Sequence, residues 1–307
     1  MTKPPCHSNP QLRAFVANCL MGGDAITETP KKWIRDLVIF ECEGRSIQFR
    51  QKPEVINGNL DQFIGRCAET TEVIVANVSD ADVVGVKLAI ERICWLLSFV
   101  SGCRVICYEH EYPNGSGLMH FSAASGVAQH FRPVLNIRDG KQVKAFVEQT
   151  YDNYACLEQS RKLNVVIDYL AQAEAPGQLL EIRSVLVFVA LESLKHTFAH
   201  SEGILYADGA FRKPTWTPGK RGHNYGFMEL VKMMLGKVNM TCDLTSAYAL
   251  RNDLIHSGLS SESFNRQREL YEDVHDLNRE YMLRLLGYRG RYSPYAFERR
   301  GISAEIS

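Results

Sequence analysis

The residues of this chain that are best suited to chemistry lie close together, in residues 251–258. Asn252 and His256 are four positions apart, so a helix through this stretch places both on one face. Arg251 lies about 100° round the helix from Asn252, and its long side chain can lean toward that face. A cationic Arg, a polar amide and a titratable His at one helix end are the groups that a phosphate-bearing substrate requires.

The helix that carries these residues is predicted to span residues 243–257. Gly258 can end it, because glycine readily adopts the left-handed backbone found just after a helix. This places His256 in the last turn, where the negative end of the helix dipole favours the imidazolium form. An exposed Arg and a His that only caps the helix would show the same spacing without any function.

A second predicted helix, over residues 178–200, carries Glu192, His196 and His200 at intervals of four residues. Three possible ligands on one face could hold a metal ion. Zinc peptidases, however, place a Glu directly after the first His of the pair, where this chain has Thr197. A solvated or interface face is the favoured interpretation, so neither a metal site nor a cofactor is predicted.

The two helices together resemble the HEPN superfamily, and within it the ApeA-like HEPN domains of bacterial antiphage proteins. The signature of these helical domains is an Arg, a polar residue, about three variable residues and a His, preceded by a helix with an apolar-Glu-apolar core. Residues 187–194, which include Glu192, look like the earlier helix, and residues 251–256 look like the signature. The resemblance covers about residues 142–288.

The resemblance implies a metal-independent endoribonuclease that works as a homodimer, in phage defence or stress-induced RNA cleavage. His256 would be the general acid/base at the RNA 2′-OH and the 5′-oxygen leaving group. Arg251 would hold the phosphate and stabilise the phosphorane, while Asn252 would orient the reacting groups. Glu192 would support them by orienting Arg251 or His256. Some HEPN toxins are regulated through a Tyr two residues after the His, but Gly258 stands there, so that regulation is not expected.

Local basic segments offer RNA a surface, although the 35 Lys and Arg residues are balanced by 35 Asp and Glu residues. In the glycine- and proline-rich residues 201–223, the residues predicted to contact the RNA backbone are Arg212, Lys213, Lys220 and Arg221. Aromatic residues here and in the C-terminal tail could stack on unpaired bases. These are Trp216, Tyr225, Tyr288, Tyr292 and Tyr295. A solvated loop and a frayed terminus would explain the same residues without RNA.

The two halves of the chain differ in hydrophobic periodicity, which predicts an α+β fold. In the first half, the expected strands are residues 37–42, 46–51, 72–78, 104–112 and 118–123, with one helix over residues 80–99. In the second half, helices are expected over residues 142–174, 178–200, 224–237, 243–257 and 262–287. The predicted organisation is a mixed α/β sensing or recruitment domain, residues 1–140, followed by an all-α HEPN-like helical bundle, residues 141–307.

The composition is that of an ordinary globular protein of 307 residues. A net charge of zero excludes proteins that coat nucleic acid through overall basicity. The nine cysteines are scattered and odd in number, which indicates reduced thiols and a reducing compartment. No stretch is apolar enough to cross a bilayer, so a cytoplasmic protein with no membrane partner is predicted.

An alternative to the endoribonuclease would use the same surface for binding alone, without catalysing a reaction. A catalytically silent HEPN-like module could bind nucleic acid, nucleotide or a protein partner there, because many helical bundles keep a polar interface without reacting. The two hypotheses differ in whether His256 and Arg251 can approach one phosphate together.

Overall fold

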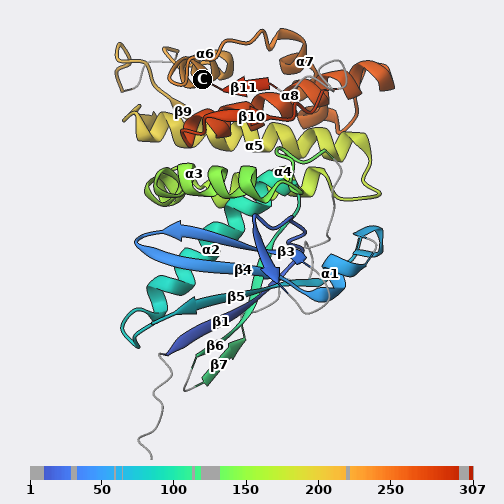
Figure 1. Ribbon diagram of the computed structural model, residues 1–307. Coiled ribbons are helices and arrows are strands. Elements are labelled where there is room, and N and C mark those ends of the chain that lie inside the picture. The colour runs from blue at the N-terminus through green and yellow to red at the C-terminus, as the bar shows by residue number, and fades with distance from the viewer. Residues whose placement is uncertain are drawn as a thin grey trace, which may run out of the picture. The chain divides into compact units, whose positions relative to one another are not determined.

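The computed structural model has an α+β fold, as predicted. It describes residues 10–28, 33–58, 60–63, 65–112, 115–118, 132–218, 222–296 and 304–306. The chain forms two compact units, Met1–Asp152 with Glu174–Pro176, and Asn153–Ala173 with Gly177–Ser307 (Figure 1). The sequence puts the change of architecture between residues 140 and 141, where a long helix begins, whereas the contacts divide the chain inside that helix.

Within the described residues, the first unit contains a seven-stranded antiparallel sheet in the order β2-β3-β4-β5-β1-β6-β7 (Figure 1). Its strands are β1 (Gln11–Ala17), β2 (Ala25–Glu28), β3 (Trp33–Cys42), β4 (Arg45–Gln51), β5 (Glu69–Ala76), β6 (Ile106–Tyr112) and β7 (Gly115–Leu118). The first strand of the chain pairs with β5 on one side and β6 on the other. The middle of the sheet is therefore held by contacts between distant parts of the sequence.

The strands predicted over residues 37–42 and 46–51 lie in β3 and β4, which pair as an antiparallel hairpin. Glu43 and Gly44 join the strands with φ angles of 51° and 70°, the left-handed backbone that a two-residue hairpin turn requires. Along β4, Ile47 and Phe49 are fully buried and alternate with residues that are more exposed. This alternation is the period of two expected for a strand with one face in the core.

Helices of the first unit include α1 (Pro53–Asn57) and the long α2 (Val83–Ser101). Five apolar positions at helical spacing predict α2. Val86, Ile90, Ile93 and Leu97 are buried, whereas Val83 at the start of the helix is only partly buried. The helix ends at Gly102, whose φ of 70° is favourable for glycine. The periodicity of this segment therefore identified both the helix and its buried face.

The second unit is mainly helical. The helix predicted over residues 142–174 is in fact two helices, α3 (Gly140–Arg161) and α4 (Leu163–Ala173), because Lys162 between them has a φ of 49°. The remaining helices are α5 (Leu180–Ser201), α6 (Phe227–Gly236), α7 (Thr245–Ser257) and α8 (Phe264–Leu285), within a few residues of those predicted. Because α5 packs against α4, α6, α7 and α8, a polar side chain on α5 can meet residues from several helices.

The tail after α8, which includes β10 (Gly290–Tyr292) paired with β11 (Ala304–Ile306), is anchored in the core. Tyr288, Tyr292 and Tyr295 are 3%, 3% and 1% exposed, so the prediction that they stack on RNA bases is wrong. Asp276 of α8, itself buried, accepts the backbone N–H groups of Tyr295 and Ala296. These three tyrosines are therefore core residues.

We expect Asp276→Ala to lower the free energy of unfolding by roughly 1–3 kcal/mol, because it leaves two buried N–H groups without their acceptor. The measurement is chemical denaturation of the wild type and the variant. Asp273→Ala is the matched control, since Asp273 is exposed and lies one turn earlier on the same helix. Equal losses in both variants would show that Asp276 does not anchor the tail.

Candidate functional site

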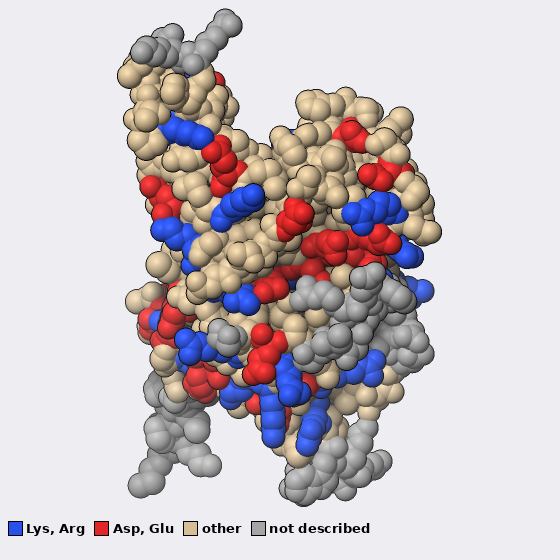
Figure 2. All heavy atoms as spheres, turned by 90° about the horizontal axis from the view of Figure 1, so that it is seen from above, with Lys and Arg blue, Asp and Glu red and all other residues tan. Residues whose placement is uncertain are grey.

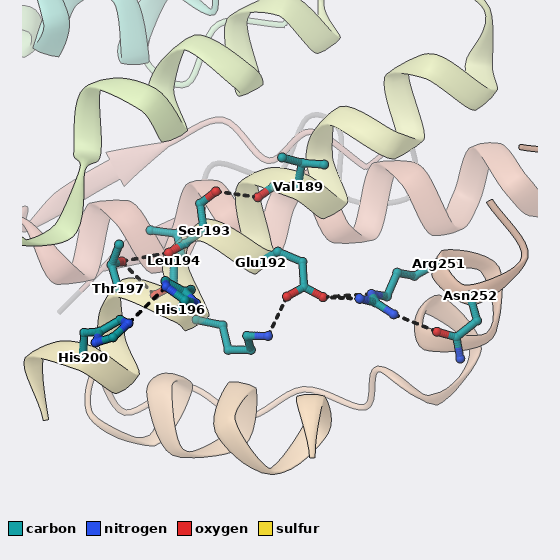
Figure 3. Close-up of polar contacts among 10 residues, drawn as sticks. Val189, Glu192, Ser193, Leu194, His196, Thr197, His200, Arg251 and Asn252 are labelled. Atoms are coloured by element: carbon teal, nitrogen blue, oxygen red, sulfur yellow. Dashed lines mark hydrogen bonds and ion pairs between the residues drawn. The ribbon is translucent and has the colours of Figure 1, made fainter. Parts of the chain in front are cut away.

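Arg251 of α7 and Glu192 of α5 form an ion pair at the centre of the candidate site (Figure 3). Arg251 Nε donates to Glu192 Oε1 at 2.9 Å, and Nη2 donates to the same oxygen at 2.5 Å. Arg251 Nη1 donates to Asn252 Oδ1 at 2.8 Å. The structure thus brings together three of the four residues that the sequence predicts for the site, and Glu192 is placed to orient Arg251.

The carboxylate of Glu192 also binds a second cation, which the sequence analysis did not include. Lys195 Nζ lies 2.5 Å from Glu192 Oε2. The side chains of Lys195, Arg251 and Glu192 are only 13%, 20% and 25% exposed, so solvent screens their charges less than at an open surface. One carboxylate between two cations leaves a net positive charge. The sequence does indicate this contact, because Lys195 follows Glu192 by three positions, which puts both on the same side of α5.

Two aromatic rings lie against the cations. Phe227 of α6 and Tyr248 of α7 stack with their centroids 5.4 Å apart. The Arg251 guanidinium is 5.0 Å from the centroid of Phe227 and 5.9 Å from that of Tyr248, and Lys195 Nζ is 5.1 Å from that of Phe227. Cation–π attraction at these distances adds to the ion pair in fixing the guanidinium. Tyr248 precedes Arg251 by one helical turn, whereas nothing in the sequence linked Phe227 to the site.

His256 lies in the last turn of α7, as predicted. The helix ends at Gly258, which has a φ of 73° and donates its N–H to the carbonyl of Leu254 at 3.0 Å. His256 is exposed, and none of the described residues forms a hydrogen bond, ion pair or ring contact with it. Its imidazole is therefore accessible to a substrate in solution.

Arg251 and His256 point to different surroundings in this structure. Five residues of helix separate them by about 7.5 Å along the axis and about 140° in rotation. Arg251 faces Glu192 of α5, whereas His256 faces solvent. A bound nucleotide can span such a separation, but a direct hydrogen bond between the two side chains cannot.

Arg212 is engaged inside the protein. It follows the short hairpin of β8 (Tyr206–Ala207) and β9 (Ala210–Phe211), within the segment predicted to be a loop. Its side chain is 8% exposed, pairs with Asp208 at 3.1 Å and also donates to Asn224 Oδ1. Its guanidinium lies 4.8 Å from the ring centroid of Trp216. Arg212 therefore holds this segment together, and its burial does not fit the predicted contact with RNA.

Lys213 is more accessible but also has a partner. Its Nζ lies 2.5 Å from Glu229 Oε1, and Glu229 in turn accepts the backbone N–H of Gly226 at the start of α6. These two contacts, first the N–H of Gly226 and then Lys213, lower the pKa of Glu229. The other two residues predicted to bind RNA, Lys220 and Arg221, lie outside the described residues.

An acidic cavity of about 530 Å³ lies at the other end of α7 from His256. Its lining includes four acidic residues, Asp243, Asp273, Asp276 and Glu280, and one basic residue, Arg266. Figure 2 shows a band of acidic side chains near the middle of one face, whereas the basic side chains lie around it and several gather at the lower edge of the view. Since α7 has 13 residues, this cavity is roughly 20 Å from His256. Its carboxylates would repel phosphates, so the C-terminal end of α7 is the better surface for a polyanion.

In the part of the chain that the structure describes, no three His, Cys, Asp or Glu side chains are grouped so that they could hold a metal ion. None of the helices described is both long enough and apolar enough to cross a membrane. Comparisons with known protein families, curated proteins and solved structures find no match to this chain.

Proposed function

We propose that the protein is a metal-independent endoribonuclease of HEPN type that acts where α5 meets the C-terminal half of α7. The observation that carries this proposal is the guanidinium of Arg251, which is held by Glu192 and Asn252 on the same helix as the exposed His256. A fixed cation near an accessible acid/base group is what cleavage of a phosphodiester without a metal requires.

Arg251 would bind the scissile phosphate. Its three hydrogen bonds to Glu192 and Asn252 use only part of the donors of a guanidinium, and the side chain is 20% exposed. Because Lys195 shares the charge of Glu192, positive charge remains for the phosphate. A cation that is fixed before the substrate arrives stabilises the additional charge of the phosphorane without reorganisation.

His256 would transfer the protons. The RNA 2′-OH lies beside the phosphate, so no metal-activated water is needed as the nucleophile. His256 takes the proton of the 2′-OH as its oxygen attacks phosphorus, and Asn252, one turn earlier, orients the reacting groups. The bond from phosphorus to the 5′-oxygen breaks, and this oxygen takes up a proton. The products are a 2′,3′-cyclic phosphate and a 5′-hydroxyl.

We also infer a homodimer, because an in-line reaction needs a base and an acid on opposite sides of phosphorus. One copy of the motif supplies one imidazole, so a second copy would supply the other. Three large apolar residues around the C-terminal end of α7 support an interface here. Ile255, Leu259 and Phe264 are 46%, 69% and 67% exposed. A two-fold contact would remove them from water beside both copies of His256.

We expect light scattering to give a mass twice that of the chain. The double substitution Leu259→Asp and Phe264→Asp should shift the protein to monomers and lower its activity at the same concentration, since it charges the apolar surface. Val84→Asp is the control, because Val84 is 78% exposed on α2 of the first unit. A wild-type monomer with full activity would contradict the two-copy site.

The function itself is tested by incubating the purified full chain with total RNA in EDTA and mapping the new RNA ends. EDTA inactivates metal-dependent contaminating nucleases, and His256→Ala purified in the same way controls for metal-independent ones. Cleavage by the wild type alone that leaves 2′,3′-cyclic phosphates supports the proposal. If the protein binds RNA, nucleotide or another protein but leaves RNA intact, the catalytically silent module is the better description. RNA cleavage therefore supports the endoribonuclease, and binding without cleavage supports the catalytically silent module.

A further inference from the structure

His196 and His200 form a close pair on the exposed side of α5, one turn beyond Glu192 (Figure 3). Their Nε2 atoms are 3.1 Å apart, and their ring centroids are 4.6 Å apart. The nuclease site proposed above uses neither residue. Imidazole nitrogens are the commonest protein ligands for divalent transition metals.

The distance between the two nitrogens fits a shared metal ion. With bonds of about 2.05 Å from each Nε2 to a metal, a separation of 3.1 Å corresponds to an N–metal–N angle of about 98°. This angle lies between that of adjacent ligands in an octahedral or square-planar site and that of a tetrahedral site. The separation of the two nitrogens therefore suits one shared ion.

Neighbouring aromatic residues hold the two imidazoles in place. Phe211 of β9 is 5% exposed, and its ring centroid lies 5.2 Å from each of the His196 and His200 centroids. The Tyr206 ring lies 5.5 Å from His196 and 5.8 Å from His200. Side chains that are ordered before the ion arrives lose less conformational entropy on binding, which favours affinity.

The charges around His196 also bear on metal binding. Partial burial, the neighbouring His200 and Lys195 lower the pKa of His196, although Glu192 opposes the shift. A lowered pKa favours the neutral imidazole, whose lone pair can bind a metal. Lys195 is itself paired with Glu192, which reduces its repulsion of an incoming cation.

We propose that His196 and His200 bind one divalent transition metal ion, such as Ni²⁺, Cu²⁺ or Zn²⁺, through their Nε2 atoms. Water fills the remaining positions, since no third His, Cys, Asp or Glu side chain among the described residues completes the group. The hydrogen bond between the two rings is given up, and the ring that donated it carries its proton on Nδ1 instead. No net proton or electron is transferred in this step.

The test is calorimetric titration of the full chain with Ni²⁺, after dialysis against EDTA and removal of the chelator. His196→Phe and His200→Phe are the informative variants, because phenylalanine keeps the ring contacts with Tyr206 and Phe211 but lacks the nitrogen. Loss of an outer partner of a metal ligand already weakens binding by roughly 10- to 100-fold, so loss of a ligand should weaken it at least tenfold. His223→Phe is the control, an exposed histidine outside the pair.

A second readout follows the ligands themselves. Cu²⁺ bound to the wild type should show nitrogen hyperfine coupling from two imidazoles in electron paramagnetic resonance, and from one in either Phe variant. Unchanged Ni²⁺ affinity in both variants, or no binding to the wild type at millimolar Ni²⁺, overturns the proposal. RNA cleavage is assayed in EDTA, so failure of the nuclease hypothesis leaves these metal measurements unaffected.

Discussion

His256→Ala is expected to reduce RNA cleavage by roughly 10²- to 10⁴-fold, the usual contribution of a general acid or base. The expected loss is in kcat rather than KM, because a proton-transfer group acts in the transition state and contributes little to binding of the ground state. The measurement is the rate of cleavage of a defined RNA in EDTA, at saturating and at limiting substrate.

The fold should not change with this substitution. His256 is exposed and none of the described residues contacts its side chain, so its removal creates no cavity and leaves no buried partner behind. Thermal melting of the variant should therefore match that of the wild type. His223→Ala controls for the loss of an exposed histidine elsewhere in the same unit. Comparable rates for wild type and His256→Ala, with equal melting temperatures, would remove His256 from the mechanism.

The helices of the second unit could be predicted because their signals are local. An apolar stripe with a period of 3.6 residues, ended by glycine, needs no knowledge of the neighbouring elements. The break at Lys162 was missed, since a single non-glycine residue with positive φ leaves no trace in hydrophobic periodicity. Helix existence was therefore more predictable than helix continuity.

Strand β1, in contrast, is not among the strands that the sequence predicts. Its buried residues Leu12, Ala14 and Val16 alternate properly, but Ala is a weak strand former and Arg13 interrupts the apolar run. In the sheet, Arg13 pairs with Glu72 of β5 at 2.5 Å and Glu111 of β6 at 3.1 Å. These partners are distant in sequence, so only the pairing of the strands explains why a charged residue, Arg13, interrupts the apolar run of β1.

Only part of the candidate site could be predicted, because some of its contacts lie within one helix and others depend on the packing of distant helices. Asn252 and His256 share a helix with Arg251, and their spacing alone defines their relation. The contact between Glu192 and Arg251 depends on the packing of α5 against α7, and the sequence pointed to it only through the family resemblance. Charge and aromatic content did not distinguish exposed residues from buried ones. Arg212 and Tyr295 were taken for RNA contacts on that basis, but they hold the fold together.

The ion pair between Glu192 and Arg251 leads to an expected result for a pair of substitutions. Arg251→Ala should lower kcat by roughly 10²- to 10³-fold, the cost of removing one fixed donor to a developing oxyanion. Glu192→Ala should also lower kcat, but less, because Arg251 keeps its hydrogen bond to Asn252 and its contact with Phe227. Glu192→Gln should restore part of the rate, since the amide oxygen can still accept from the guanidinium.

The double variant with Glu192→Ala and Arg251→Ala tests whether Glu192 acts only by positioning Arg251. If Glu192 acts only by holding Arg251, Glu192→Ala should cost almost nothing further once Arg251 is alanine, and the two effects on kcat should be far from additive. Glu202→Ala is the control, because Glu202 also pairs with a cation, Lys237 at 2.7 Å, at the end of α5. Its effect should be small in both backgrounds. Effects of Glu192→Ala and Arg251→Ala that multiply in full would mean that Glu192 contributes to the reaction without Arg251, and its assignment as a positioning residue would then be wrong.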